Sequence, residues 1–209
     1  MQEASTTQAI MLEYKTAPIC VNFALKSRFE TLNDKTLVLM LEEALRYIYD
    51  AKTKGAKKGR WLTYAGKSGT GKTYLATKIY NYCGRNLKCG FKITGETHKF
   101  LDFYSITSSQ LADNFRACGY DDYANKADML YIDDLGAEKD TTGYVKGKMC
   151  ELLSRRVGKW TLITSNLSLE SLGESYDNRI ASRIIRDENV LVSIKDVQDY
   201  ALRKMQNQK

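Results

Sequence analysis

The sequence predicts an α/β protein in which a central parallel sheet is covered by helices on both faces, giving a three-layer sandwich. Short apolar strand patterns alternate along the chain with segments whose apolar residues recur at helical spacing, as is typical of parallel sheets. Between the first such strand and the next helix lies the G-x-x-x-x-G-K-[ST] motif Gly66-Lys67-Ser68-Gly69-Thr70-Gly71-Lys72-Thr73. Together, the alternation and the motif predict the fold of the P-loop NTPases.

The elements follow one another in a regular order. Residues 36–52 carry apolar side chains at helical spacing, and Gly55 ends this helix. The strand 61–65 precedes the motif, and an amphipathic helix follows it until Gly84. Residues 84–99 contain three glycines and several lysines, which indicates a loop or a hairpin insertion.

The second half of the chain continues the alternation. Residues 100–106 predict a strand, and Thr107 with Gln110 predicts a capping box for the following helix. We expect further strands at 129–132, 160–164 and 190–192. Helices are expected over 142–156, around residues 180–184 and after the last strand.

Length and composition bound the organisation. The 209 residues suffice for one well-buried domain, expected over residues 18–209 after a flexible tail at residues 1–17. Hydrophobic residues make up 43% of the chain, yet no apolar run is long enough to span a bilayer, and no signal peptide is evident. Five cysteines without a C-x-x-C pair, and one histidine, predict reduced thiols in the cytoplasm rather than a zinc site or disulfides.

The net charge of +7 is unevenly distributed. A basic cluster precedes the motif and consists of Lys52, Lys54, Lys57, Lys58 and Arg60. A polyanionic partner such as nucleic acid would suit such a cluster. A solvated linker explains a basic run equally well, so the composition leaves nucleic-acid contact open.

The motif at residues 66–73 indicates a nucleotide site. Its glycines let backbone N–H groups wrap around a phosphate chain, and the following helix directs its N-terminus at the negative charge. Lys72 is expected to reach the β- and γ-phosphates, and Thr73 to ligate Mg²⁺. The cofactors predicted from these residues are ATP and Mg²⁺.

Two carboxylates follow the apolar strand 129–132. Asp133 is expected to hold Mg²⁺ through its water shell, and Asp134 to orient or deprotonate the attacking water. Residues 133–136 also satisfy the D-x-x-G pattern of GTPases, and residues 125–128 satisfy their N-K-x-D pattern. Because the second pattern falls between the phosphate loop and the first pattern, which is not the GTPase order, we do not predict GTP specificity.

Polar side chains later in the chain add candidates. Asn166 follows the strand 160–164, where its amide would reach the γ-phosphate or the attacking water. Arg179 and Arg183 lie four residues apart and share one face of a predicted helix. Two guanidinium groups on one exposed face suit a phosphate clamp supplied to a neighbouring subunit, although a surface pair bonded to local carboxylates is an alternative.

Three segments, taken in order after the phosphate loop, carry a family resemblance: Leu130-Tyr131-Ile132-Asp133-Asp134-Leu135-Gly136, Leu162-Ile163-Thr164-Ser165-Asn166-Leu167 and Arg179-Ile180-Ala181-Ser182-Arg183. They resemble the DnaC/DnaI-type helicase loaders and the related IstB transposition ATPases, both of the AAA+ class. The resemblance spans roughly residues 20–195. It implies an AAA+ fold of the initiator and loader clade, with slow ATP hydrolysis until assembly.

The resemblance also implies roles and partners. Asn166 would be the sensor 1 residue, Arg183 the arginine finger acting in trans upon self-association, and Arg179 its companion. The partners would be a DnaB-type hexameric replicative helicase and single-stranded DNA, with no membrane association. The helix after Thr107 lies where the clade carries its initiator-specific insertion, which makes DNA-contact candidates of Lys88, Lys92, Lys99 and Arg116.

Two departures from the family pattern stand out. Few residues precede the ATPase pattern, whereas relatives usually carry a substantial helicase-binding region there. Asp199-Tyr200-Ala201 falls where relatives tend to place an arginine after the tyrosine, which puts the sensor 2 contact in doubt and leaves Arg203 as a weak substitute. The short N-terminus, together with the richness in tyrosine and lysine, suggests a phage or mobile-element version.

Alternatives to a helicase loader stay open at this point. An IstB-like transposition helper would prefer duplex DNA, and a non-hydrolysing, ATP-gated replication adaptor would bind ATP without turnover. The N-terminal pattern disfavours the first, and the intact Lys72, Asp133, Asp134 and Arg183 disfavour the second. A small-molecule kinase would need an arginine-bearing lid and an acceptor pocket, and no segment has either pattern.

Overall fold

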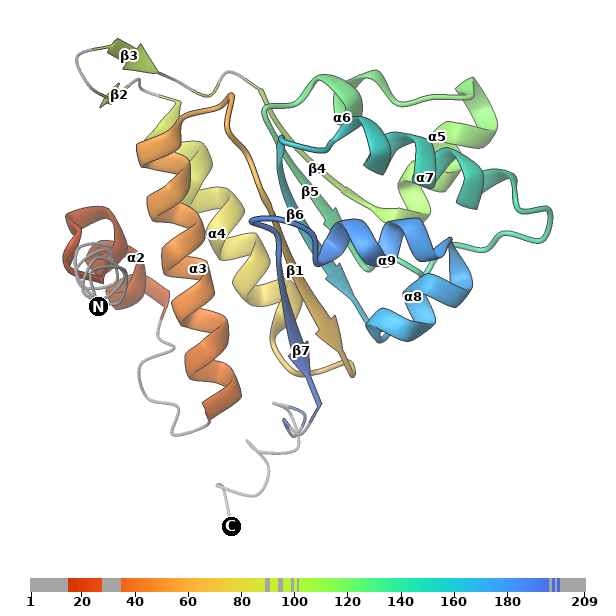
Figure 1. The fold of residues 1–209 in the computed structure, drawn as a ribbon, viewed down its shortest axis with the longest axis horizontal. Coiled ribbons are helices and arrows are strands. Elements are labelled where there is room, and N and C mark those ends of the chain that lie inside the picture. Colours follow the sequence, from red (N-terminus) through yellow and green to blue (C-terminus); the bar gives the residue numbers. More distant parts are fainter. Residues whose placement is uncertain are drawn as a thin grey trace.

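The computed structural model of the protein describes residues 15–27, 35–88, 91–93, 96–98, 100, 102–195, 197 and 199 (Figure 1). Most of the tail expected at residues 1–17 lies outside these ranges, as do Lys99, Arg203 and most of the expected last helix. Of the tail, Lys15 is described, and its ammonium forms an ion pair with Glu42 at 2.7 Å.

Within these residues the central sheet has five strands, all parallel, in the order β4-β5-β6-β1-β7. The strands are β1 (Trp61–Gly66), β4 (Phe103–Thr107), β5 (Met129–Asp133), β6 (Trp160–Ser165) and β7 (Val190–Ile194). A separate antiparallel hairpin, β2 (Phe91–Ile93) and β3 (Glu96–His98), follows the first helix after the phosphate loop. The parallel α/β architecture predicted from the sequence is confirmed. Of the two possibilities predicted for residues 84–99, a loop or a hairpin, the structure has the hairpin at β2 and β3, whereas residues 84–87 belong to α4.

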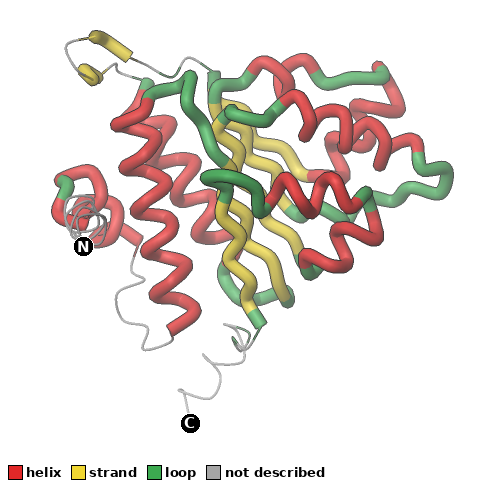
Figure 2. Tube along the Cα trace, viewed as in Figure 1, coloured by secondary structure: helices red, strands yellow, loops and turns green. Residues whose placement is uncertain are grey.

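Helices cover both faces of this sheet (Figures 1 and 2). One layer holds α2 (Pro18–Ser27), α3 (Lys35–Lys54) and α4 (Lys72–Leu87). The other holds α5 (Ser108–Cys118), α6 (Asp122–Lys126), α7 (Tyr144–Arg155), α8 (Leu169–Ser175) and α9 (Asn178–Ile184). Among the described residues, no helix combines the length and the apolar character needed to cross a bilayer.

Successive side chains of a strand point to opposite faces of the sheet, so alternate residues pack into the two hydrophobic cores, one on each face. In β5, Met129 and Tyr131 belong to the core under α3 and α4, whereas Leu130 and Ile132 belong to the core under α5 and α7. Because both faces are covered, the strands are apolar along almost their whole length, which explains why they were visible in the sequence.

Local signals set most boundaries of the helices. Thr107 and Gln110 form the predicted capping box at the start of α5, with the Thr107 side chain accepting from the Gln110 N–H at 3.2 Å. The prediction that Gly84 ends α4 is wrong, since α4 continues to Leu87. A Cβ at Gly84 would lie 3.7 Å from the Phe103 ring, an ordinary van der Waals contact, so the packing does not require glycine here and the helix tolerates its cost in propensity.

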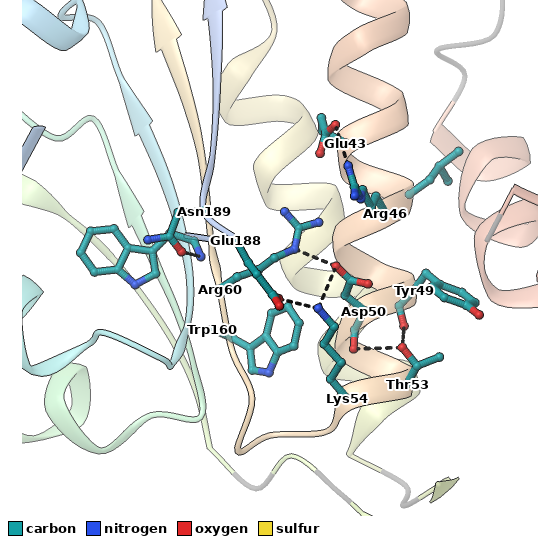
Figure 3. A network of polar contacts seen from close by, with 12 residues as sticks. Glu43, Arg46, Tyr49, Asp50, Thr53, Lys54, Arg60, Trp160, Glu188 and Asn189 are labelled. Atoms are coloured by element: carbon teal, nitrogen blue, oxygen red, sulfur yellow. Dashed lines mark hydrogen bonds and ion pairs between the residues drawn. The ribbon is translucent and has the colours of Figure 1, made fainter. Parts of the chain in front are cut away.

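The basic cluster before the phosphate loop is partly internal. Arg60 is only 3% exposed, and its Nε donates to Asp50 Oδ2 at 2.9 Å (Figure 3). Its guanidinium also lies over the Tyr47 ring, 5.4 Å from the centroid. Lys54 pairs with Asp50 and, across to the turn before β7, with Glu188 at 2.5 Å. Two of the five cations in the cluster therefore tie α3 to the sheet.

Replacing Asp50 with asparagine tests this arrangement. Asp50→Asn leaves the buried Arg60 guanidinium without its charge partner, and we expect a loss of about 3 kcal/mol in the free energy of unfolding. The matched control is Glu188→Gln, which removes an exposed partner of Lys54 and is expected to cost less than about 1 kcal/mol. Urea unfolding followed by circular dichroism measures both, and equal losses would contradict a structural role for the buried pair.

Candidate nucleotide-binding site

The sheet order brings the predicted site residues to one edge. Strands β5, β6 and β1 are neighbours, and because they are parallel their carboxyl ends meet at the same edge of the sheet. Asp133 ends β5, Asn166 follows β6, and the phosphate loop follows β1. Ligands of open α/β sheets bind at this kind of edge, beyond the carboxyl ends of the strands.

The loop has the backbone geometry that a phosphate cradle requires. Gly66, Gly69 and Gly71 have φ values of 142°, 74° and 92°, a region that side-chain-bearing residues rarely adopt. A Cβ at Gly66 would lie 2.1 Å from the carbonyl oxygen of Ile194, so β7 packs too closely for any other residue. Helix α4 begins immediately after the loop and directs its N-terminus at this space.

Lys72 is held inside the loop. Its Nζ donates to the carbonyl oxygens of Gly66 and Lys67 at 2.7 and 2.5 Å, and to Asn166 Oδ1 at 3.0 Å. The residue is only 4% exposed. This burial lowers the pKa of the ammonium, while the two nearby carboxylates act in the opposite direction. A single cation thus connects the loop with the residue expected to sense the γ-phosphate.

The Asp133 carboxylate accepts hydrogen bonds from three hydroxyl groups. Its Oδ1 accepts from Thr73 Oγ1 at 3.0 Å, from Tyr131 OH at 2.7 Å and from Thr164 Oγ1 at 2.5 Å. Thr73 and Asp133, which come from the start of α4 and the end of β5, therefore lie together as the sequence predicted for a metal site.

Asp134 is held in an unusual conformation. Its φ is 58°, a region that aspartate tolerates better than most residues. The backbone is fixed on both sides, because its N–H donates to Thr164 Oγ1 at 2.9 Å and its carbonyl accepts from Ser108 Oγ at 2.6 Å. The carboxylate accepts from the Asn166 amide at 2.7 Å. The side chain expected to handle the attacking water is thus oriented by the predicted sensor.

These donors fit Mg²⁺ bound together with nucleotide. No group of three or more His, Cys, Asp or Glu side chains arranged for a metal occurs in the part of the chain that the structure describes. Mg²⁺ usually keeps several waters and binds through one or two carboxylates plus substrate phosphates. The Thr73 hydroxyl and the Asp133 carboxylate are hard oxygen donors beside a phosphate cradle, so the site suits a metal that arrives with ATP.

A carboxylate also approaches the loop from the C-terminal side. A Cβ at Gly69 would lie 1.6 Å from Asp199 Oδ2, so the Asp199 side chain lies directly against the cradle. The sequence resemblance places a cation in this part of the chain, whereas the residue observed beside the loop is an anion.

The two arginines of α9, Arg179 and Arg183, make no described contact with the phosphate loop. Arg179 is 80% exposed and pairs with Asp177, whose Oδ2 accepts from its Nε at 2.9 Å and from its Nη2 at 2.7 Å. Together with Arg183 and Cys150 it lines a surface pocket of about 210 Å³. The described contacts do not join either arginine to the phosphate loop. The local carboxylate pair considered as an alternative is therefore present for Arg179, and the finger role of Arg183 stays a prediction.

The predicted DNA-contact residues are divided between two places. Lys88 follows α4, and its ammonium lies 5.4 Å from the centroid of the Phe103 ring. Arg116 belongs to α5 in the opposite helix layer, where it pairs with Asp113 at 2.9 Å and donates to the Lys139 carbonyl. The Lys92 side chain and Lys99 lie outside the described residues, so the four candidates stay a prediction.

The N-K-x-D pattern is remote from the phosphate loop. Asn125 and Lys126 end α6, and Lys126 pairs with Asp122 at 2.8 Å. The pattern precedes β5 and so lies at the amino end of the sheet, opposite the loop that follows β1. This placement agrees with the decision, made from chain order, not to predict GTP specificity.

Several solved structures are similar to this fold. The DnaC helicase loader aligns with 81% of this chain and 97% of its own, with a TM-score of 0.62 and 20% identity. DnaI aligns with 78% of this chain and 87% of its own, with a TM-score of 0.58 and 25% identity. This is the AAA+ P-loop NTPase fold. The predicted resemblance to DnaC/DnaI-type AAA+ loaders is confirmed in structure.

A replication initiator also has this AAA+ fold. A DnaA structure bound to AMPPCP and single-stranded DNA aligns with 79% of this chain and 50% of its own, with a TM-score of 0.52 and 14% identity. No protein-family model and no curated protein matches the sequence. The relationship to AAA+ proteins is thus carried by three-dimensional structure and by the short motifs at the strand ends.

Sequence reasoning missed four residues of this AAA+ site. Ser108, Tyr131, Thr164 and Asp199 all contact the loop or the two aspartates. Tyr131 offered a signal, because residues i and i+2 of a strand share a face and so a hydroxyl two positions before Asp133 points the same way. Asp199 offered none, since its contact arises only when β7 is placed beside β1.

Neutralising Asp199 tests the electrostatics of the loop. A charge about 4 Å from another contributes about 1 kcal/mol in water, so Asp199→Asn is expected to strengthen ATP binding about fivefold. The control Glu188→Gln makes the same change in net charge at the opposite end of β7 and is expected to leave the affinity unchanged. Titration with a fluorescent ATP analogue measures both. Unchanged or weaker binding in Asp199→Asn would contradict a repulsive role.

Proposed function

We propose that this protein is an ATP-dependent loader that binds a DnaB-type hexameric replicative helicase and assists its placement on single-stranded DNA. The observation that carries the proposal is the structural match to the DnaC helicase loader, which extends over 97% of the DnaC chain. The match to DnaI, over 87% of its chain, supports the same role. The protein would use ATP as the switch between its helicase-bound and free states.

The nucleotide chemistry would be performed by the cluster at the sheet edge. The loop N–H groups and Lys72 would hold the phosphates, which an AMPPCP-bound DnaA of the same fold supports. Mg²⁺, when bound beside Thr73 and Asp133, would supply charge neutralisation at the phosphate oxygens. Asp134, held by Asn166 at 2.7 Å, would orient or deprotonate the attacking water.

Completion of the site would require a second copy. Arg183 lies on α9, away from its own phosphate loop, which suits a finger that reaches the γ-phosphate of a neighbouring subunit. The finger would stabilise charge in the transition state, and Arg179 would accompany it. Hydrolysis in the free protein would therefore be slow, and assembly on the helicase or on DNA would accelerate it.

Contact with single-stranded DNA is supported by a structure of the same fold and by the net charge of the chain, not by a described DNA site. A DnaA of the same fold is bound to single-stranded DNA, and the net charge of this chain is +7. Arg116 on α5 is the described candidate with an exposed guanidinium, and its partner Asp113 is 76% exposed, so phosphate could replace this carboxylate. Lys88, which follows α4, would contribute to the same contact, and Lys92 and Lys99 are further candidates.

The arginine finger can be tested by substitution. Arg183→Ala is expected to lower the stimulated ATPase rate by about a thousandfold or more while leaving ATP affinity unchanged, because the finger acts only in the transition state. Arg186→Ala removes an exposed arginine just past the end of α9 and is the matched control, expected to retain the stimulated rate.

Lys72→Ala provides the second reference for this assay, since it removes the cation of the cradle and is expected to abolish hydrolysis. Phosphate release with and without single-stranded DNA and helicase gives the rates. If Arg183→Ala also abolished ATP binding, its assignment to the finger would be wrong. If the unmodified protein showed no turnover that depends on Lys72, the non-hydrolysing adaptor would become the better description.

The proposed helicase partner can be tested by measuring the mass of the complex that it forms with this protein. Size-exclusion chromatography with light scattering on the protein mixed with the replicative helicase of its host is expected to give a complex of defined mass with a non-hydrolysable ATP analogue. ADP is expected to weaken this complex. Absence of a complex with either nucleotide would overturn the loader proposal and favour a transposition helper, which preferential binding to duplex DNA would identify.

A further inference from the structure

Tyr131 lies where a purely apolar residue would be expected. It occupies the middle of β5, is 4% exposed and belongs to the core under α3 and α4. Its hydroxyl nevertheless has polar neighbours on three elements. It donates to Asp133 Oδ1 at 2.7 Å, and the hydroxyl groups of Thr77 on α4 and Thr164 on β6 also interact with it. A buried phenol with several polar neighbours is well fixed in place.

The hydrogen bonds to Asp133 are unevenly distributed. Among the residues that the structure describes, the three donors Thr73, Tyr131 and Thr164 all end on Oδ1. Oδ2 receives none of these three hydrogen bonds and would be the oxygen available to a water of a metal shell. Hydrogen bonds from three hydroxyl groups, of which those of Tyr131 and Thr164 belong to buried residues, hold the carboxylate in one orientation. This reduces the reorganisation needed when a cation arrives.

The three donors are not equivalent. Thr73 is itself an expected metal ligand, and Thr164 also accepts the N–H of Asp134 at 2.9 Å. Tyr131 is neither an expected metal ligand nor, among the described hydrogen bonds, a contact of Asp134. Its hydroxyl also lies near that of Thr77, which stands one helical turn after Thr73 on α4.

We propose that Tyr131 is a positioning residue that fixes the Asp133 carboxylate for Mg²⁺, and that it thereby sets the affinity of the nucleotide complex for the metal. The proposal rests on the proposed ATP-binding function. It assigns to Tyr131 no contact with nucleotide, so the residue should affect metal-dependent binding and leave metal-free binding unchanged. Removal of hydrogen-bonding partners of metal ligands typically costs 10–100-fold in metal affinity.

The experiment compares Tyr131→Phe with the unmodified protein. Binding of a fluorescent ATP analogue is measured in EDTA and in Mg²⁺, and Mn²⁺ binding to the protein–nucleotide complex is measured by the loss of the free Mn²⁺ signal in electron paramagnetic resonance. Tyr131→Phe is expected to weaken Mn²⁺ binding about tenfold and to leave the affinity in EDTA unchanged.

A matched control is available in the same core. Tyr80 lies on α4 with its ring centroid 6.0 Å from that of Tyr131, and its hydroxyl interacts with Ser105 while making no described hydrogen bond to Asp133. Tyr80→Phe therefore removes a phenol hydroxyl nearby and is expected to leave Mn²⁺ affinity unchanged. Because each ratio of affinities with and without metal is taken within one variant, partial unfolding lowers the binding stoichiometry without changing the ratio.

The outcomes separate the two proposals. Unchanged Mn²⁺ affinity in Tyr131→Phe, or an equal loss in Tyr80→Phe, would overturn the positioning role while leaving the nucleotide site intact. A loss of affinity in EDTA as large as the loss in metal would mean that Tyr131 supports the loop as a whole, and would also overturn the proposal. If the unmodified protein bound no nucleotide, the proposed function itself would fail.

Discussion

The site depends on the hydrogen bonds that the Asp133 carboxylate accepts. It stands at the end of β5 and receives hydroxyl groups from β5 itself, from β6 and from the first turn of α4. The phosphate loop is therefore tied to the sheet through a negatively charged group. Hydrogen bonds to a carboxylate are stronger where the local dielectric constant is low. Loss of any one donor therefore leaves the negative charge of Asp133 less well compensated.

This arrangement follows from the topology of the sheet. Parallel neighbours place their carboxyl ends side by side, and β5, β6 and β1 are consecutive in the sheet although other elements separate them in the chain. Asn166 can consequently contact both Lys72 and Asp134, at 3.0 and 2.7 Å. One amide thus joins the cation expected at the phosphates to the carboxylate expected at the attacking water.

Much of this could be predicted because the signals are local. The glycines of the loop, the apolar strands and the aspartates that end β5 each follow from backbone geometry or from burial on both faces. The contact of Asp199 with Gly69 and the burial of Arg60 against Asp50 could not be predicted, because each depends on how distant elements pack. Gly84 shows another limit, since a single glycine lowers helix propensity without ending a helix whose apolar face is buried on both sides of it.

We expect the charges around the phosphate loop to favour exchange of nucleotide over its tight retention. Lys72 is the cation described inside the cradle, and it already shares its protons with two carbonyl groups and an amide. Asp199 adds a negative group beside Gly69, where a bound phosphate chain would be repelled. In the proposed switch, each cycle needs release of the spent nucleotide. An anion near the cradle would keep the nucleotide affinity moderate, whereas the proposed finger of a neighbouring subunit would add positive charge in the transition state alone.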